Sequence, residues 1–231
     1  MSHVPDDTMQ NRLRIASDCE VRGAGIEIGA LMSPMLSPSL NSKFVDRFKK
    51  EDLLSQYPEL LPDREVIINP DFICSGETLD GMENNTHDYI IANHFLEHCE
   101  DFIGTLKRHY EVVKPGGRLF YAVPNKDNSF DKPRDLTDFD HLLRDHIQGP
   151  KVSRYDHYVD WVKHVSKIEN THVQSRAMEL MDFQYSIHYH VWSAHSFPKL
   201  LMDSLDFIGA NMYLKRYELY GAELIAVLQK S

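Results

Sequence analysis

The sequence has few cysteines, no long apolar run and a shortage of basic residues. It contains only three cysteines in 231 residues, and no two of them form a C-x-x-C pair. It therefore predicts neither a disulfide framework nor a cysteine-rich zinc site. No apolar stretch approaches the ~20 residues that cross a bilayer, and the polar N-terminus lacks the apolar segment of a secretory signal. We therefore expect no membrane insertion and a location in the reducing cytoplasm.

Basic residues are outnumbered, with 25 Lys and Arg against 35 Asp and Glu and a formal net charge of -10. This charge would repel a polyanion, so extended nucleic acid is an unlikely partner. Hydrophobic residues make up 42% and charged residues 26% of the chain, as in ordinary globular proteins. The length suffices for one large domain with a substantial core. The composition leaves the oligomeric state open.

Short apolar segments alternate with amphipathic segments along most of the chain. Strands are expected at residues 23–30, 42–48, 65–73, 87–94, 118–124, 210–219 and 222–230, and helices at 50–61, 100–113 and 196–205. This alternation predicts an α/β fold with a doubly wound, mostly parallel seven-stranded sheet.

The alternation lapses between Asn125 and Ile187, a stretch far longer than an ordinary connection. Helices are expected within it at residues 138–146 and 154–168, and Thr137 followed by Asp140 has the form of a capping box. We therefore expect an N-terminal extension at 1–20 and one domain at 21–231. That domain would carry a helical lid insertion at 125–187, after the fifth strand and over the carboxyl edge of the sheet.

A His-x-x-Glu-His motif, formed by His94, Glu97 and His98, follows the fourth expected strand. On a helix these three positions share one face and converge on a single metal ion. The spacing is also that of inverted zinc peptidases, in which the two histidines bind zinc and the glutamate activates water. The peptidase motif lies within a helix, however, whereas this one directly follows a strand. A third interpretation is structural, with Glu97 set against a helix dipole and His98 packed beneath the helix start.

Several segments together resemble the class I S-adenosylmethionine-dependent methyltransferases. Glu27 and Gly29 end the first strand, Asp46 ends the second, and "VVKPGGRLFYAVP" forms helix, turn and fifth strand. More narrowly, the chain looks like bacterial methyltransferases associated with surface-glycan synthesis. The segments that carry this likeness are "GIEIGALMSP", "FICSGETL", "IIANHFLEH", "SFDKPRDLTDFDHLLRD" and "HYHVWSAHSF".

The resemblance implies a Rossmann-like methyltransferase fold with S-adenosylmethionine as cofactor. Gly29 would let the chain pass close beneath the cofactor, and Asp46 would accept hydrogen bonds from both ribose hydroxyls, or else cap the following helix. Glu77 would lie beside the adenine. The full set of implied cofactor-binding residues is Glu27, Gly29, Asp46, Glu77 and Asn93.

A metal site is implied by a further likeness, to the small-RNA 2'-O-methyltransferases and certain quinone-precursor methyltransferases. Those enzymes carry Glu-x-x-Glu-His after the fourth strand, and in the small-RNA enzymes a further histidine precedes a Trp-Thr pair. "HYHVW" matches that histidine with His188. The implied ligands are His94, Glu97, His98 and His188, and the histidines make Mn, Fe or Zn as plausible as Mg.

The resemblance implies methyl transfer to an oxygen of a sugar or sugar-containing metabolite, a small-molecule or glycan acceptor. A divalent ion would acidify the hydroxyl and an imidazole would take its proton. The candidate catalytic residues are His94, His98 and His190, with His141 as a further candidate base. Two alternatives remain open: methylation of another small acceptor without metal, and a noncatalytic binding module built on the cofactor fold.

Overall fold

The computed structural model describes residues 6–56, 61–62, 64–166 and 168–231. Parts of three expected segments therefore lie outside the described residues: 1–5 of the extension, 57–60 of the helix at 50–61, and 167 of the helix at 154–168. No helix among the described residues is long and apolar enough to cross a membrane.

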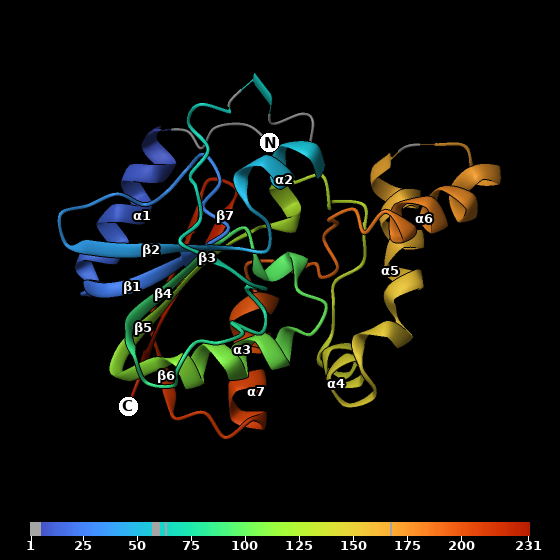
Figure 1. The fold of residues 1–231 in the computed structure, drawn as a ribbon. Coiled ribbons are helices and arrows are strands. Elements are labelled where there is room, and N and C mark those ends of the chain that lie inside the picture. The colour runs from blue at the N-terminus through green and yellow to red at the C-terminus, as the bar shows by residue number, and fades with distance from the viewer. Residues whose placement is uncertain (1–5, 57–60, 63, 167) are drawn as a thin grey trace.

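In the part of the chain that the structure describes, seven strands form one sheet in the order β3-β2-β1-β4-β5-β7-β6 (Figure 1). The number of strands and the α/β class are as predicted, but the sheet is mixed, and the prediction of a mostly parallel sheet is wrong. The first five strands pair in parallel, whereas β7 runs antiparallel to both β5 and β6. The physical reason is the short turn at Gly221 and Ala222, because two residues can join a hairpin but cannot form a crossover. The strands are β1 (Gly23–Ile28), β2 (Leu40–Asp46), β3 (Phe72–Ile73), β4 (His87–Asn93), β5 (Val113–Pro124), β6 (Met212–Tyr220) and β7 (Glu223–Lys230).

Both faces of the sheet are covered, as the alternation of side chains along β4 shows. Ile90 and Ala92 point into one buried cluster with residues of α3 (Phe102–Val112) and α7 (Ser196–Phe207). Tyr89 and Ile91 point into another with residues of α1 (Asp6–Asp18). The helix α1, which lies beside the sheet in Figure 1, was not predicted, and its Ile15 and Ala16 belong to this second cluster.

Between β5 and α7, the described residues form three α-helices beside the carboxyl ends of the strands (Figure 1). They are α4 (Phe139–Gln148), α5 (Arg154–Trp161) and α6 (Val173–Asp182). A separate small core joins α5 and α6, formed by Tyr158, Val162, Val173, Ala177, Leu180, Ile187 and Tyr189. The α4 helix is capped by Asp138, whose side chain accepts the His141 N–H at 2.8 Å. Thr137 pairs instead with Val191, so the expected capping box does not form.

The remaining short elements complete the fold. The helix α2 (Lys50–Gln56) follows β2 and places Leu53 in a small cluster with Met32 and Ile67. Short 3-10 helices occur at η2 (Leu96–His98), η3 (Lys126–Asn128), η4 (Pro150–Val152) and η6 (Asn170–His172), and a π-helix at η5 (Val162–Ser166).

Candidate active site and metal centre

The carboxyl ends of β1, β2 and β4 bring the expected cofactor-binding residues Gly29, Asp46 and Asn93 to one edge of the sheet. Gly29 has a φ of 66°, and a Cβ placed on it would meet no atom within 4 Å. The space above this turn is therefore open to a ligand. The amide of Asn93 is buried beside the Glu27 carboxylate, and no hydrogen bond of normal geometry uses its nitrogen or oxygen among the described residues. Both features suit a site that is completed by a bound molecule.

The carboxylate of Asp46, at the end of β2, is the expected ribose acceptor. It accepts the Phe48 N–H at 3.3 Å, and burial raises its pKa from the ordinary value even though that hydrogen bond opposes the rise. Backbone hydrogen bonds from Phe48 and Arg47 leave this carboxylate with acceptor capacity to spare. The geometry is therefore compatible with the ribose contact and with a structural role in the turn that leads into α2 at Lys50.

The two other acids of the expected cofactor set are engaged with the backbone. Glu27 is 1% exposed, accepts the Met35 N–H with both carboxylate oxygens, and has its pKa raised to about 7 by burial. It thereby holds the loop that follows β1. Glu77 accepts the N–H groups of Glu100 and Asp101 at 3.1 and 3.3 Å, and burial raises its pKa to about 7 as well. Glu77 thus supports the start of α3.

The structure brings together three of the four predicted metal ligands: Glu97, His98 and His188. One potential ligand atom from each lies within 4.8 Å of the others, and we call this group the edge cluster. Glu97 is completely buried; its Oε1 lies 3.3 Å from Nδ1 of His94 in an ion pair, and its Oε2 has no partner among the described residues. Although burial opposes the charge, the neighbouring imidazoles lower its pKa, His94 foremost. The His94 imidazolium therefore offsets part of the Glu97 charge, and Oε2 keeps its acceptor capacity for a metal ion.

Both imidazoles of the edge cluster are oriented by hydrogen bonds at Nδ1. The Nδ1–H of His98 donates to the Ile187 carbonyl at 2.8 Å, and that of His188 donates to the Asp131 carboxylate at 2.6 Å. In each ring this arrangement fixes the proton on Nδ1 and leaves the Nε2 lone pair for a ligand. Metal-binding histidines are usually held in this way. Burial, and then the nearby His188, lower the pKa of His98 to about 4, which keeps its ring neutral.

His94 was expected on one helix face with Glu97 and His98, and that expectation is wrong. His94 has a φ of 50° and turns the chain after β4, while only Leu96–His98 form a 3-10 turn. Its Nδ1 lies 3.3 Å from Glu97, its Nε2 lies 2.7 Å from Glu223, and it is not part of the edge cluster. Although burial opposes the charge, the carboxylates of Glu223 and Glu97 raise the pKa of His94 to about 9. The peptidase hypothesis fails, because it requires both histidines on one helix.

His190, one of the expected catalytic residues, is 1% exposed and is not part of the edge cluster. It lies with His141 in a second group of side chains. Within the insertion, the buried Arg134 guanidinium pairs with Asp131 at 2.8 Å and with Asp160 at 2.6 Å.

Sequence reasoning missed two acids that support the edge cluster. Asp131 comes from the insertion and orients His188, as described above. Glu223 opens β7 and pairs with Pro124 at the end of β5, which places it between Arg12 and His94. An antiparallel strand starts where its parallel neighbours end, so the hairpin signal at Gly221 is the clue that could have placed Glu223 at this edge.

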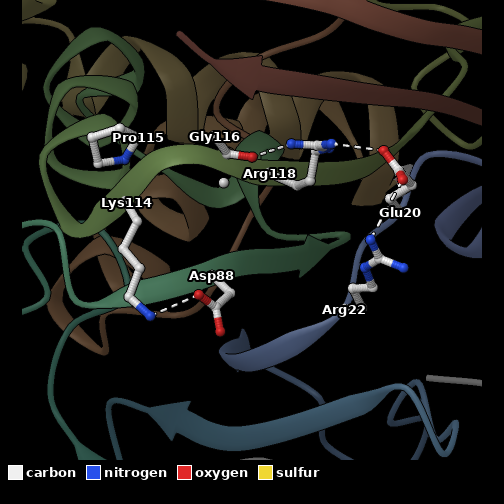
Figure 2. A pocket seen from close by; sticks show the side chains of 8 residues that line it. Glu20, Arg22, Asp88, Lys114, Pro115, Gly116 and Arg118 are labelled. Carbon is white, nitrogen blue, oxygen red and sulfur yellow. Dashed lines mark hydrogen bonds and ion pairs between the residues drawn. The ribbon is translucent and has the colours of Figure 1, made fainter.

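A surface pocket lies at the opposite edge of the sheet, near the starts of β1 and β4 (Figure 2). Its charged side chains pair with one another: Lys114 with Asp88 at 2.7 Å, and Arg118 with Glu20 at 3.3 Å. None of the predicted site residues lines it. We therefore place the candidate active site at the carboxyl edge.

Comparison with known proteins agrees with this geometry. A family profile described as a methyltransferase domain matches residues 10–204. The chain belongs to this family. The predicted class of enzyme, an S-adenosylmethionine-dependent methyltransferase, is thereby confirmed, and an enzyme is favoured over a noncatalytic binding module. No curated protein sequence matches the chain significantly.

Solved structures show the same fold at low identity. The PH0226 protein from Pyrococcus horikoshii OT3 is 14% identical with a TM-score of 0.54, covering 97% of this methyltransferase and 91% of that chain. A possible histamine N-methyltransferase from Thermotoga maritima is 15% identical with a TM-score of 0.51, covering 96% and 89%. This methyltransferase spans only 56% of the CurJ carbon methyltransferase chain, which is 15% identical with a TM-score of 0.49 over 98% of this chain.

Proposed function

We propose that this methyltransferase transfers the methyl group of S-adenosylmethionine to a hydroxyl oxygen of a sugar or sugar-containing metabolite, with a divalent ion held by Glu97, His98 and His188. One observation carries the metal: Glu97 is a fully buried carboxylate whose Oε1 pairs with His94, while its Oε2 has no partner among the described residues, and the carboxylate lies with two imidazoles whose Nε2 atoms are left unprotonated. Two imidazoles and one carboxylate suit Mn, Fe or Zn, and Mg to a lesser degree.

The chemistry gives the ion a purpose. A bound divalent ion lowers the pKa of a hydroxyl group that it contacts. The protein's own contribution is to orient the ligands and keep them in the required protonation state. Ile187 and Asp131 fix the two rings, and burial keeps His98 neutral near pH 7. His94 stays protonated at that pH and holds Glu97 and Glu223 in place.

The cofactor is proposed to lie along the ends of β1, β2 and β4. Gly29 provides the close approach, Asp46 the acceptor for the ribose hydroxyls, and Asn93 an amide beside Glu27 whose remaining hydrogen-bonding capacity a ligand would use. Glu27 and Glu77 support the cofactor site indirectly. Glu27 holds the loop after β1, and Glu77 holds the start of α3.

The insertion at 125–187 is proposed as the lid over the acceptor. It supplies Asp131, and the segment that follows it crosses Glu97, with the Tyr189 N–H donating to the Glu97 carbonyl at 2.7 Å. The edge cluster therefore forms only where insertion and core meet, a usual place for acceptor binding. The cysteines Cys19, Cys74 and Cys99 are all free, which suits the proposed cytoplasmic location.

The test is methyl transfer from labelled S-adenosylmethionine to a panel of nucleotide sugars and short glycans, with and without a chelator. We expect product only with metal present, and calorimetric binding of the cofactor in both conditions. Turnover on an amine or carboxylate that persists in chelator would instead establish the metal-free alternative. Absence of any heat with S-adenosylmethionine or its demethylated product would contradict the cofactor site.

A further inference from the structure

Four further side chains converge at the base of the insertion, apart from the edge cluster. His141 and Asp145 lie one turn apart on α4, His157 lies on α5, and His190 lies on the extended segment before α7. One potential ligand atom from each lies within 4.8 Å of the others, and three of the four residues are buried. We call this group the insertion cluster.

The spacing within the insertion cluster matches that of ligands around a tetrahedral ion. The Nε2 atom of His141 lies 3.1 Å from Nε2 of His157 and 3.1 Å from Oδ2 of Asp145, and the latter two atoms are 3.5 Å apart. A tetrahedral zinc ion with bonds of ~2.0–2.1 Å separates its ligand atoms by about 3.3–3.4 Å. The distances between these three atoms are therefore close to those between three ligand atoms of a tetrahedral zinc ion.

His190 supplies an independent indication of a missing partner. It is 1% exposed, and neither ring nitrogen makes a hydrogen bond of normal geometry among the described residues, although the Glu100 backbone lies near one of them. A buried imidazole with an unsatisfied nitrogen is costly. A hydrogen-bonded network accounts for the contacts of His141, His157 and Asp145 but leaves a ring nitrogen of His190 without a partner, whereas an ion would use all four side chains.

The neighbours of the insertion cluster orient its acid. The Ser153 hydroxyl donates to Oδ1 of Asp145 at 2.5 Å, which leaves Oδ2 facing the histidines. The Arg144 guanidinium donates to Nδ1 of His141 at 2.7 Å, an arrangement that places the ring proton on Nε2. Binding through Nε2 therefore requires the proton to move to Nδ1 and Arg144 to turn away. Arg144 is exposed and has solvent into which to turn.

We propose that His141, Asp145, His157 and His190 bind a structural Zn²⁺ ion. Four protein ligands in a buried setting leave no position for a substrate, which distinguishes structural zinc sites from catalytic ones. Three imidazoles and one carboxylate are donors that zinc accepts. The ion would tie α4 and α5 to the segment that carries His188, and so hold the insertion against the core.

The experiment uses the full chain with the substitutions His98→Ala and His188→Ala, which remove the edge cluster. This host is stripped with a chelator and titrated with Zn²⁺ or Co²⁺. We expect one equivalent to bind, a visible Co²⁺ spectrum of tetrahedral form, and a Tm that rises by about 5–10 °C when Zn²⁺ exceeds its Kd a hundredfold. Because the host lacks the edge cluster, the result does not depend on the function proposed above.

Two added substitutions and one control decide the outcome. Asp145→Asn and His157→Gln, each tested separately, should abolish the Co²⁺ spectrum and the Zn²⁺-dependent rise in Tm. Asp140→Asn should retain both, because Asp140 is an exposed acid on the same helix. If the host does not fold, Asp145→Asn in the otherwise native chain should lose one equivalent of zinc. A folded chain that binds no zinc, or equal binding after Asp145→Asn, would overturn the proposal.

Discussion

The edge cluster and the insertion cluster use the same kinds of side chain in different surroundings. The edge cluster has three groups at the junction of core and insertion, and its histidines are oriented by Ile187 and Asp131. The insertion cluster has four groups, drawn from α4, α5 and the segment before α7. Three protein ligands leave a position for a reacting group, whereas four close the site. The comparison teaches that ligand number and placement, more than residue type, separate a proposed catalytic ion from a structural one.

The largest expected effect is a loss of turnover on removing a ligand of the edge cluster, which is proposed to be catalytic, unlike the insertion cluster. His98→Ala should lower turnover by about 10²-fold or more while leaving cofactor affinity nearly unchanged, because it removes a group that acts on the acceptor. Steady-state rates and calorimetry measure the two quantities. His172→Gln, at an exposed histidine, is the matched control. Full turnover of His98→Ala in chelator would return the edge cluster to a structural role beneath the helix start.

The affinity for the cofactor should depend on neither cluster, whereas Asp46→Ala should weaken it. We expect a loss of about 1–3 kcal/mol, since a buried pair of hydrogen bonds to the ribose would be lost. Calorimetry with S-adenosylmethionine measures the change. Asp52→Ala, at an exposed acid on α2, should have no effect. Equal affinity of the Asp46 and Asp52 variants would leave Asp46 with only a structural role in the turn that leads into α2.

The orientation of His188 gives a smaller effect that tests the edge cluster alone. Asp131→Asn keeps an acceptor for the Nδ1–H of His188 but removes the charge, so metal affinity should fall about 10-fold. Competition with a chromogenic chelator measures the affinity. Asp127→Asn, at a nearby exposed acid, should match the unmodified protein. A loss of zinc from the insertion cluster in Asp131→Asn would show that the two clusters are not independent.

The smallest effect concerns His94, which belongs to neither cluster. Its pKa is raised to about 9, so its charge contributes stability that is fully present below its unfolded pKa of ~6.5 and is lost as pH rises through about 9. Because its side chain is 40% exposed, solvent screening limits the contribution to below about 1 kcal/mol. Denaturant unfolding at pH 6 and pH 10 should show this loss in the native chain and not in His94→Gln. An identical pH dependence in both proteins would contradict it.

The sequence by itself predicted the features that repeat along a local segment. Burial on one or both faces of a strand imposes a pattern on consecutive residues, so β4 and the buried part of β5 were located closely. The same local signals marked α3, α4 and α7. The weak pattern at 65–73 was misread, because only Phe72–Ile73 form a strand there.

In the candidate site, too, local sequence features predicted some residues, and contacts between distant segments determined the others. Glu97, His98 and His188 could be proposed from spacing and family resemblance, and the fold brings them together. The partners of each group follow from packing between distant segments. Asp131 is 57 positions from His188 in the sequence, and Glu223 is 129 positions from His94. The periodic pattern of a helix or strand gives no information about contacts over such separations.

The insertion cluster was decided by tertiary structure alone. His141 and Asp145 are one turn apart on a helix, a spacing that occurs on any solvated face. Only the docking of α5 and of the segment at His190 buries Asp145 and turns four separate polar residues into one group. The local sequence determines which residues share a face of a helix or strand. The packing of the helices against the sheet determines which faces meet, and this packing therefore also determines which polar atoms are buried without a partner, at a cost in free energy.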